Sequence, residues 1–400
     1  MKLRFLTAGE SHGRALVGIL EGVPSGLRLT AEDIHRELRR RKLGYGRGAR
    51  QKMEDDSVQI LSGVRHGLTL GSPIALMIEN KDWRNWTDVM QPEPPASVDA
   101  GTAAPGTSGV RRRLEVPRPG HADYVGGIKY GHEDMRNVLE RASARETTIR
   151  VAIAAVARQL LSQLGIGLAS RVTRIGDIED LSPLPADLTS VNLKADSFQL
   201  RVLDASIDAQ MVEHVGEMKK KGDTLGGEFE VLAWGLPLGL GSYVQWDRRI
   251  EAEIGRAFLS LNAIKGVEIG LGFRLAATPG SQAHDELYPA SGKSGATARV
   301  EYRTNRSGGV DGGMTTGQPL VVRAAMKPLS TLMDALDSVK LSTGEVAKAH
   351  VERSDVCAVP AAAVIGESLL ALVLADAVLD KFGGDSMQEL ADRVADWRHK

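Results

Sequence analysis

The chain has 400 residues, of which 42% are hydrophobic and 25% are charged. It is therefore long enough to bury a large core and too apolar to be wholly disordered. The 50 basic residues balance 51 acidic ones, which argues against a non-specific nucleic-acid binder. A single cysteine, Cys357, excludes a disulfide framework and a cysteine-based zinc site, and it fits a reducing compartment such as the cytoplasm.

The first half of the chain is predicted to be strands followed by a long helix. Strands are expected at 15–23, 58–64 and 73–78, and Thr30 is predicted to cap a helix over 31–42. The range 91–110 is rich in proline and small residues, so we predict a mobile loop with the potential to act as a lid. The strongest helical pattern covers 133–164, which corresponds to a helix on the order of 45 Å long.

The second half is predicted to contain another β region and a very apolar helix. Strands are expected at 168–178, 225–236 and 320–326, helices at 208–221, 247–264 and 360–381, glycine-rich loops at 280–295 and 305–317, and a short helix capped by Ser386. The apolar segment contains Glu367 and Asp376, which argues against a membrane span. Long strand runs without regular βα alternation predict an α+β fold.

Two short sequence similarities relate the halves. Residues 22–27 (GVPSGL) resemble 235–240 (GLPLGL), and 71–74 (GSPI) resemble 317–320 (GQPL), in the same order. Either two related β layers share a helical middle, or turn residues match by chance.

Residues 9–13 (GESHG) fit the G-x-S-x-G pattern of a serine hydrolase, which needs a strand before the motif and a helix after it. Because 15–20 is predicted to be a strand, we favour a turn that places Ser11 and His12 at a cleft. A catalytic Ser11 and a plain hairpin turn with a solvated His12 remain the alternatives. The nucleotide-binding glycine motifs are absent, since Leu287 stands where a Walker A loop ending at 291–294 needs glycine.

Eight basic residues lie within 36–52. Arg41 falls toward the inner face of the predicted helix, and the glycine-rich turn around Arg47 lets that side chain fold back beside it. Two converging guanidinium groups form a natural site for a phosphate or a carboxylate. The alternatives are a solvated charged face and an RNA-binding patch.

Further candidates stand on turns and helix ends. Arg118 and His121 flank a Pro-Gly turn, next to Asp123, which is able to set the histidine tautomer. Asp355 precedes the apolar helix, either as a capping carboxylate or as a proton acceptor.

Arg141 and Arg145 lie one turn apart in the long predicted helix, where small alanines around Ser143 permit close approach of a flat ligand. Pairing of the two arginines with Glu140 or Glu146 is the alternative. The segment 305–314 offers backbone N–H groups, and Lys327 begins a cluster of one cation and two hydroxyls at a strand end. The histidines and carboxylates show no metal-ligand spacing, so no metal site is predicted.

Together these segments resemble the chorismate synthase family over nearly the whole chain, through 9–13, 118–121, 141–145, 353–355 and 381–385. The segment 85–115 differs from the family pattern in detail, and His132 stands where many members carry an aromatic residue. The resemblance implies a β-α-β sandwich with helices between antiparallel sheets, forming a single domain over 1–400. It also implies a cytoplasmic homotetramer that binds neither nucleic acid nor membrane.

The implied activity is that of a lyase of the shikimate pathway, which makes chorismate for aromatic amino-acid biosynthesis. The substrate, 5-enolpyruvylshikimate 3-phosphate, loses phosphate and one ring hydrogen in a 1,4-elimination that needs reduced FMN without net redox change. By this resemblance His12 protonates the departing phosphate, His121 stands near the N1/C2 edge of the flavin, and Asp355 assists proton removal through flavin N5.

The resemblance also implies the binding residues. Those for the substrate are Arg41, Arg47, Arg118, Arg145 and Arg353, with Arg50 as an additional contact. Those for FMN are Arg141, Ala142, Ser143, Asn262, Ala263, Gly312, Lys327, Pro328, Leu329, Ser330, Thr331 and Arg353. Arg41 and Arg47 are also implied in NADP binding, with either NADPH or a separate reductase as the source of electrons for the flavin.

Overall fold

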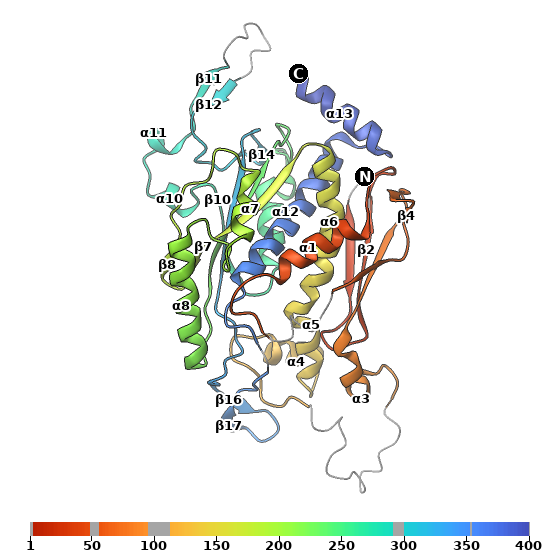
Figure 1. Cartoon of the computed structure of the whole chain (residues 1–400), viewed down its shortest axis with the longest axis vertical. Helices are drawn as coiled ribbons and strands as arrows, with labels where there is room; N and C mark the ends of the chain where they lie inside the picture. Colours follow the sequence, from red (N-terminus) through yellow and green to blue (C-terminus); the bar gives the residue numbers. More distant parts are fainter. Residues whose placement is uncertain (1–2, 49–55, 95–112, 291–299, 353, 400) are drawn as a thin grey trace.

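Two antiparallel sheets face each other across a layer of helices (Figure 1). The structure is a computed structural model that describes residues 3–48, 56–94, 113–290, 300–352 and 354–399. The first sheet has the order β1-β2-β6-β3, with β1 Arg4–Ala8, β2 Ala15–Glu21, β3 Val58–Ile60 and β6 Ile74–Glu79. The second has the order β10-β15-β9-β7-β8, with β7 Gly167–Ile175, β8 Ile178–Glu179, β9 Gly227–Trp234, β10 Ile264–Ile269 and β15 Leu320–Met326.

The helical layer consists of α1 (Ala31–Lys42), α6 (Thr147–Gln163), α9 (Ile250–Leu259) and α12 (Val359–Phe382). Helix α6 packs against β2 and β6, α12 packs against β7 and β9, and the two helices pack against each other. Helix α12 is long and apolar enough to cross a membrane, but 83% of its most apolar window is buried inside the fold. A helix that is hydrophobic all round fits a core position. The predicted β-α-β sandwich is confirmed.

The remaining elements surround this core. The other helices are η1 Lys81–Asn85, α3 Thr87–Met90, α4 Asp123–Tyr130, α5 Arg136–Ala142, η3 Ala144–Glu146, α7 Ser190–Asp196, α8 Ala205–Lys221, η4 Trp246–Arg248, α10 Phe273–Ala276, α11 Gly280–Ala283 and α13 Met387–His399. Four hairpins are formed by β4 Val64–Arg65 with β5 Leu68–Thr69, β11 Leu287–Pro289 with β12 Val300–Tyr302, β13 Val310–Asp311 with β14 Met314–Thr315, and β16 Asp337–Lys340 with β17 Glu345–Lys348.

The similar sequence segments occupy equivalent places in the two sheets. The first of each pair, 22–27 or 235–240, follows β2 or β9, and the second, 71–74 or 317–320, leads into β6 or β15. The strand order β1-β2-β6-β3 has the same pattern as β7-β9-β15-β10.

Equivalent threonines hold the segments in place. Thr69 Oγ1 donates a hydrogen bond to the carbonyl of Pro24 at 2.6 Å, and Thr315 Oγ1 donates to that of Pro237 at 2.7 Å. Each hydroxyl also accepts from the backbone N–H of the leucine three residues after that proline, at 3.0 and 2.9 Å. This shared geometry favours two related β layers over a chance match.

The single long helix expected at 133–164 was wrong. The backbone is extended at Ser143, with φ −65° and ψ 142°, so that α5 ends at Ala142 and α6 starts at Thr147. The Ser143 hydroxyl accepts from the backbone N–H of Arg145 at 3.2 Å, which is how serine competes with helical hydrogen bonding. Because of this break, Ser143 and Arg145 do not lie on one face of a continuous helix.

Other expected boundaries also changed. The helix expected at 247–264 ends at Leu259, where the Ser260 hydroxyl bonds back to the Ala257 carbonyl. Ala263 then takes a left-handed φ of 66°, which lets β10 begin at Ile264. The strand expected at 58–64 splits into β3 and the start of β4, and the glycine-rich loop 305–317 contains the β13–β14 hairpin. The elements expected at 31–42 and 320–326 are confirmed with their predicted ends.

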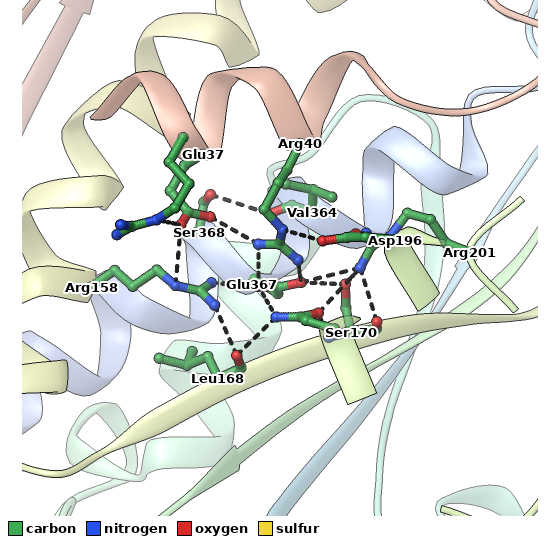
Figure 2. A network of polar contacts seen from close by, with 12 residues as sticks. Glu37, Arg40, Arg158, Leu168, Ser170, Asp196, Arg201, Val364, Glu367 and Ser368 are labelled. Atoms are coloured by element: carbon green, nitrogen blue, oxygen red, sulfur yellow. Dashed lines mark hydrogen bonds and ion pairs between the residues drawn. The ribbon is translucent and has the colours of Figure 1, made fainter. Parts of the chain in front are cut away.

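A buried ion network joins the helices to the second sheet (Figure 2). The fully buried Glu367 of α12 pairs with Arg40 of α1 at 2.8 Å and with Arg158 of α6. It also accepts from the hydroxyl of Ser170 on β7 at 2.6 Å. Burial alone would raise the pKa of Glu367, but the surrounding arginines hold it far below its usual value. The network fixes the position of α1, whose next residue, Arg41, faces the site described below.

Candidate functional site

A cavity of about 1120 Å³ lies where the C-terminal end of α1 meets the N-terminal ends of α6 and α12. Its size exceeds that of an ordinary small-molecule pocket and suits two ligands bound side by side. The candidate residues that line it are His12, His121, Asp355, Arg41, Arg47, Arg118, Arg145, Ala142, Ser143, Asn262, Ala263, Lys327, Pro328, Leu329, Ser330 and Thr331.

Some candidates lie elsewhere. Arg141 donates to the carbonyls of Thr7 and Gly9, both at 3.0 Å, on the β1–β2 hairpin. Gly312 lies in the turn between β13 and β14. Neither residue lines the cavity. Arg50, Arg353, the segment 291–294 and the part of the expected loop from 95 to 110 are outside the described residues.

Arg41 and Arg47 both line the cavity, as the turn around Arg47 predicted. Arg41 is 3% exposed, and its Nε and Nη2 donate to Thr147 Oγ1 at 3.1 and 2.8 Å. Burial and the charges of Arg47 and Arg145 lower the pKa of Arg41 to about 10. Buried Arg41 Nη1 and Arg47 Nε have no hydrogen-bond partner within the described part of the chain. A bound anion would satisfy both donors.

Arg118 and Arg145 bring two more buried guanidinium groups to the cavity. Arg118 Nη1 donates to Thr331 Oγ1 at 2.8 Å. Arg145 Nε donates to Asn80 Oδ1 at 3.0 Å, and its Nη1 pairs with Asp56. The arginines are therefore held by residues distant in sequence.

The alternative that Arg141 and Arg145 pair with nearby glutamates was wrong. Glu140 contacts His12 and Arg136, whereas Glu146 pairs with Arg150.

His12 is held on two sides. Its Nδ1 lies 2.9 Å from a carboxylate oxygen of Glu140, and its ring stacks on Trp86 with centroids 3.8 Å apart. Sequence analysis missed Glu140 and Trp86 as site residues. Glu140 is 128 positions from His12, so no local pattern connects the two. The local signal for Glu140 was its place beside the 141–145 motif.

His121 contacts the carboxylate expected to set its tautomer. Its Nδ1 lies 2.6 Å from Asp123 Oδ1, and Arg118 Nε donates to Asp123 Oδ2 at 2.8 Å. Burial would raise the pKa of Asp123, but the hydrogen bonds from His121 and Arg118 hold it well below its usual range. The ionised Asp123 thus orients both side chains toward the cavity wall.

Asp355 is not a helix cap. Helix α12 starts after Ala358 and has no side-chain cap. Asp355 Oδ1 instead accepts from the backbone N–H of Gly48 at 2.5 Å, and Oδ2 pairs with Arg47 at 2.7 Å. The carboxylate therefore joins the turn that carries Arg47 to the segment before α12.

The part of the cavity lined by Asn262 and Ala263 fits a flat heterocycle. Asn262 Nδ2 donates to the Ala142 carbonyl at 2.8 Å, whereas its buried Oδ1 has no hydrogen-bond partner among the described residues. Ala263 has a strained left-handed backbone, a feature that clusters at ligand sites. Small and apolar side chains also line the cavity, including Leu139 and Met326. An N–H group at the edge of a bound ring would satisfy Asn262.

The GESHG segment does not form a hydrolase nucleophile elbow. It connects β1 to β2, two paired antiparallel strands, instead of a strand to a helix. The Ser11 hydroxyl accepts from the Ser143 hydroxyl at 3.2 Å. The serine-hydrolase alternative is not supported.

Comparisons with known proteins agree over nearly the full length. The sequence profile described as chorismate synthase matches residues 3–379. Chorismate synthases of Enterococcus faecalis and Thermobifida fusca are 50% and 53% identical to this chain, over 99% and 97% of its length and 98% and 96% of theirs. A crystal structure of a chorismate synthase superposes with a TM-score of 0.78 at 43% identity, covering 100% of this chain and 98% of that one. The chain therefore belongs to the chorismate synthase family.

Proposed function

We propose that this chain converts 5-enolpyruvylshikimate 3-phosphate to chorismate in the described cavity, with reduced FMN bound beside the substrate. Enzymes of this family are lyases of chorismate biosynthesis that depend on a reduced flavin. One observation carries the proposal: Arg41 and Arg47 present buried N–H groups without described partners in the cavity that His12 lines. Such donors need an acceptor, and the charged guanidinium groups favour an anion.

The substrate matches the arginines in charge. It carries two carboxylates and a phosphate, and Arg41, Arg47, Arg118 and Arg145 line one cavity. Buried anions require paired cations, and guanidinium groups bind carboxylate and phosphate oxygens in a planar, bidentate manner. Arg47 keeps its ion pair with Asp355 when the substrate binds. The N–H groups of Arg47 outside that ion pair therefore contact the substrate.

His12 supplies the proton for the departing phosphate. Because its Nδ1 contacts Glu140, we assign the proton transfer to Nε2. A positioned general acid contributes ~10²–10⁴-fold to such a step. Asp355 assists removal of the ring proton with a carboxylate that Gly48 and Arg47 hold in place.

Asn262, Ala263 and the segment from Lys327 to Thr331 hold the FMN. Lys327 Nζ donates to the carbonyl of Gly120 at 2.6 Å, which ties this segment to the turn that carries His121. When bound, the reduced flavin supplies the electron-rich ring on which the elimination depends. His121 and Asp123 orient one another at the edge of this part of the cavity.

The test is anaerobic phosphate release from the enolpyruvyl substrate. We expect release and chorismate absorbance with reduced FMN, and neither with oxidised FMN or without flavin. Flavin-independent release would refute the proposal, as would no release with reduced FMN. Replacing the chemical reductant by NADPH distinguishes a chain that reduces its own flavin, at Arg41 and Arg47, from one that needs a separate reductase.

We further propose that residues 1–400 form one domain that assembles as a cytoplasmic homotetramer. A single cluster of buried hydrophobic residues contains side chains from both sheets, which supports one domain. Exposed apolar side chains on α4, namely Tyr124, Val125 and Ile128, support association between copies. Light scattering after size exclusion should give four times the chain mass of 42.9 kDa.

A further inference from the structure

Glu140 holds the backbone and the ring of His12 at the same time. Its side chain is 1% exposed, and Oε2 accepts from the His12 backbone N–H at 2.8 Å. Both carboxylate oxygens also lie within 3.0 Å of His12 Nδ1. The preceding residue is fixed as well, because the backbone N–H of Ser11 donates to the Glu140 carbonyl at 2.9 Å. Helix α5 thus determines where the imidazole stands.

The surroundings keep the Glu140 carboxylate ionised. Burial alone would raise its pKa, but the hydrogen bonds and charge of His12, with the hydrogen bond of Arg136, hold the pKa below its ordinary value. Arg136 Nη1 donates to Glu140 Oε1 at 3.0 Å, and Nη2 reaches Glu352 at 3.2 Å. An ionised carboxylate is an acceptor only, so Nδ1 must carry a proton in order to bond to it.

The other faces of the His12 ring are also defined. Trp86 stacks on it with an interplanar angle of 20°, and the Trp86 indole N–H donates to Asp82 at 3.2 Å. Asp82 Oδ2 lies 3.9 Å from His12 Nε2. Within the described ranges, the charged groups around the ring include Glu140 and Arg136 from α5, Asp82 from η1, and Glu352 from the segment before α12.

We propose that Glu140 is a positioning residue for the elimination, which holds His12 with a proton on Nδ1 and directs Nε2 toward the leaving phosphate. The inference rests on the proposed role of His12 as proton donor. When the carbon–oxygen bond to phosphate breaks, its electron pair stays on the phosphate oxygen, which takes the Nε2 proton. The other proton stays on Nδ1 and remains hydrogen-bonded to Glu140, so the imidazole is left neutral.

The variant Glu140→Gln keeps the volume and removes the charge. We expect phosphate release to slow by about 10²-fold, within the range that a general acid supplies. The substrate KM should stay unchanged, so that the whole loss appears in kcat. An unchanged kcat would overturn the inference.

Glu146→Gln is the matched control. Glu146 is a buried glutamate that pairs at 2.9 Å with Arg150, four residues away, as Glu140 pairs with Arg136 across the same spacing. Glu146 does not line the cavity, so this variant should keep the normal kcat. An equal loss in Glu146→Gln would overturn the inference, because it would show that the effect of the substitution is not specific to Glu140.

A double-mutant cycle separates this inference from the proposed function. If Glu140 acts through His12, Glu140→Gln causes no further loss in a His12→Ala protein. Multiplying losses would overturn the inference. A normal rate for His12→Ala would remove His12 from the mechanism and overturn the inference with it, whereas only a failure of the unmodified protein to release phosphate with reduced FMN would refute the proposed function. A slow His12→Ala beside a normal Glu140→Gln would refute the inference alone.

A measurement on the unmodified protein covers the case in which Glu140→Gln fails to fold. In ¹⁵N NMR of histidine-labelled protein, the His12 signal is assigned by its loss in His12→Ala. We expect the neutral ring to carry its proton on Nδ1, which is hydrogen-bonded to Glu140. A neutral ring with the proton on Nε2 would contradict the positioning role.

Discussion

Asp355→Asn tests whether the carboxylate at the start of α12 has a chemical role. Asparagine still accepts from Gly48 N–H, but it cannot balance the charge of Arg47, whose side chain is 9% exposed. A hydrogen bond to a charged group contributes about 1.5–3 kcal/mol to the free energy of unfolding. With an unfolding entropy of about 2.1 cal/mol/K per residue, that loss lowers the Tm of a 400-residue chain by about 2–4 °C.

The single-turnover rate should fall by a much larger factor than the small loss of Tm suggests. A group that accepts or donates a proton in the reaction contributes ~10²–10⁴-fold to the rate, and asparagine cannot take a proton at neutral pH. The assay is single-turnover absorbance with pre-reduced FMN, with a thermal melt on the same sample. Asp285→Asn is the control, because Asp285 accepts from the backbone N–H groups of Arg306 and Ser307 away from this cavity. A near-normal single-turnover rate in Asp355→Asn, together with a lowered Tm, would mean that Asp355 only holds Arg47 in place.

Three further substitutions test separate parts of the molecule. His12→Ala should lower steady-state phosphate release by ~10²–10⁴-fold while FMN titration and the thermal melt stay near normal; unchanged release removes His12 from the mechanism. Arg47→Lys should raise the Kd for substrate in calorimetry, because lysine keeps the charge but not the planar fork; equal affinity means that Arg47 does not bind substrate. Glu367→Gln should lower the free energy of unfolding by about 3–5 kcal/mol at pH 7, because Arg40 and Arg158 lose the buried carboxylate that they share. Because the pKa of Glu367 is lowered in the folded state, its stabilising contribution is present above the ordinary value of 4.5 and is lost as the pH falls below that value. The free energy of urea unfolding of the variant should therefore depend less on pH in that acid range than that of the unmodified protein.

Local sequence signals predicted the parts of the fold and site that depend on neighbouring residues. Helix α1 follows from a threonine cap with a reciprocal hydrogen bond to Asp33 and from an apolar stripe, and both ends matched. The contact between His121 and Asp123 spans two positions, so a turn motif was enough to find it. The family resemblance supplied the reaction and the candidate residues, most of which line the cavity.

Contacts between distant segments were not predictable in this way. Glu140 meets His12 only because the β1–β2 turn packs on α5, and no periodicity encodes that approach. Glu367 argued only against a membrane span, and its pairing with Arg40 depends on how α12 and α1 cross. The break at Ser143 was missed because apolar helical patterns lie on both sides of it, whereas a hydroxyl bonded to the backbone ends the helix.

The relation between the two sheets makes a matched prediction for Thr69→Val and Thr315→Val. Both threonines are buried, at 3% and 2% exposure, and each hydroxyl satisfies one carbonyl and one N–H of the loop after β2 or β9. Valine fills the same volume but leaves both backbone groups unsatisfied, which costs about 1–3 kcal/mol for a buried group. Urea unfolding should therefore show losses of similar size in the two variants, although the loops share little beyond their turn residues. A large loss in one variant and none in the other would mean that the hydrogen bonds look alike without having the same structural role, and it would remove the energetic support for treating the two layers as related.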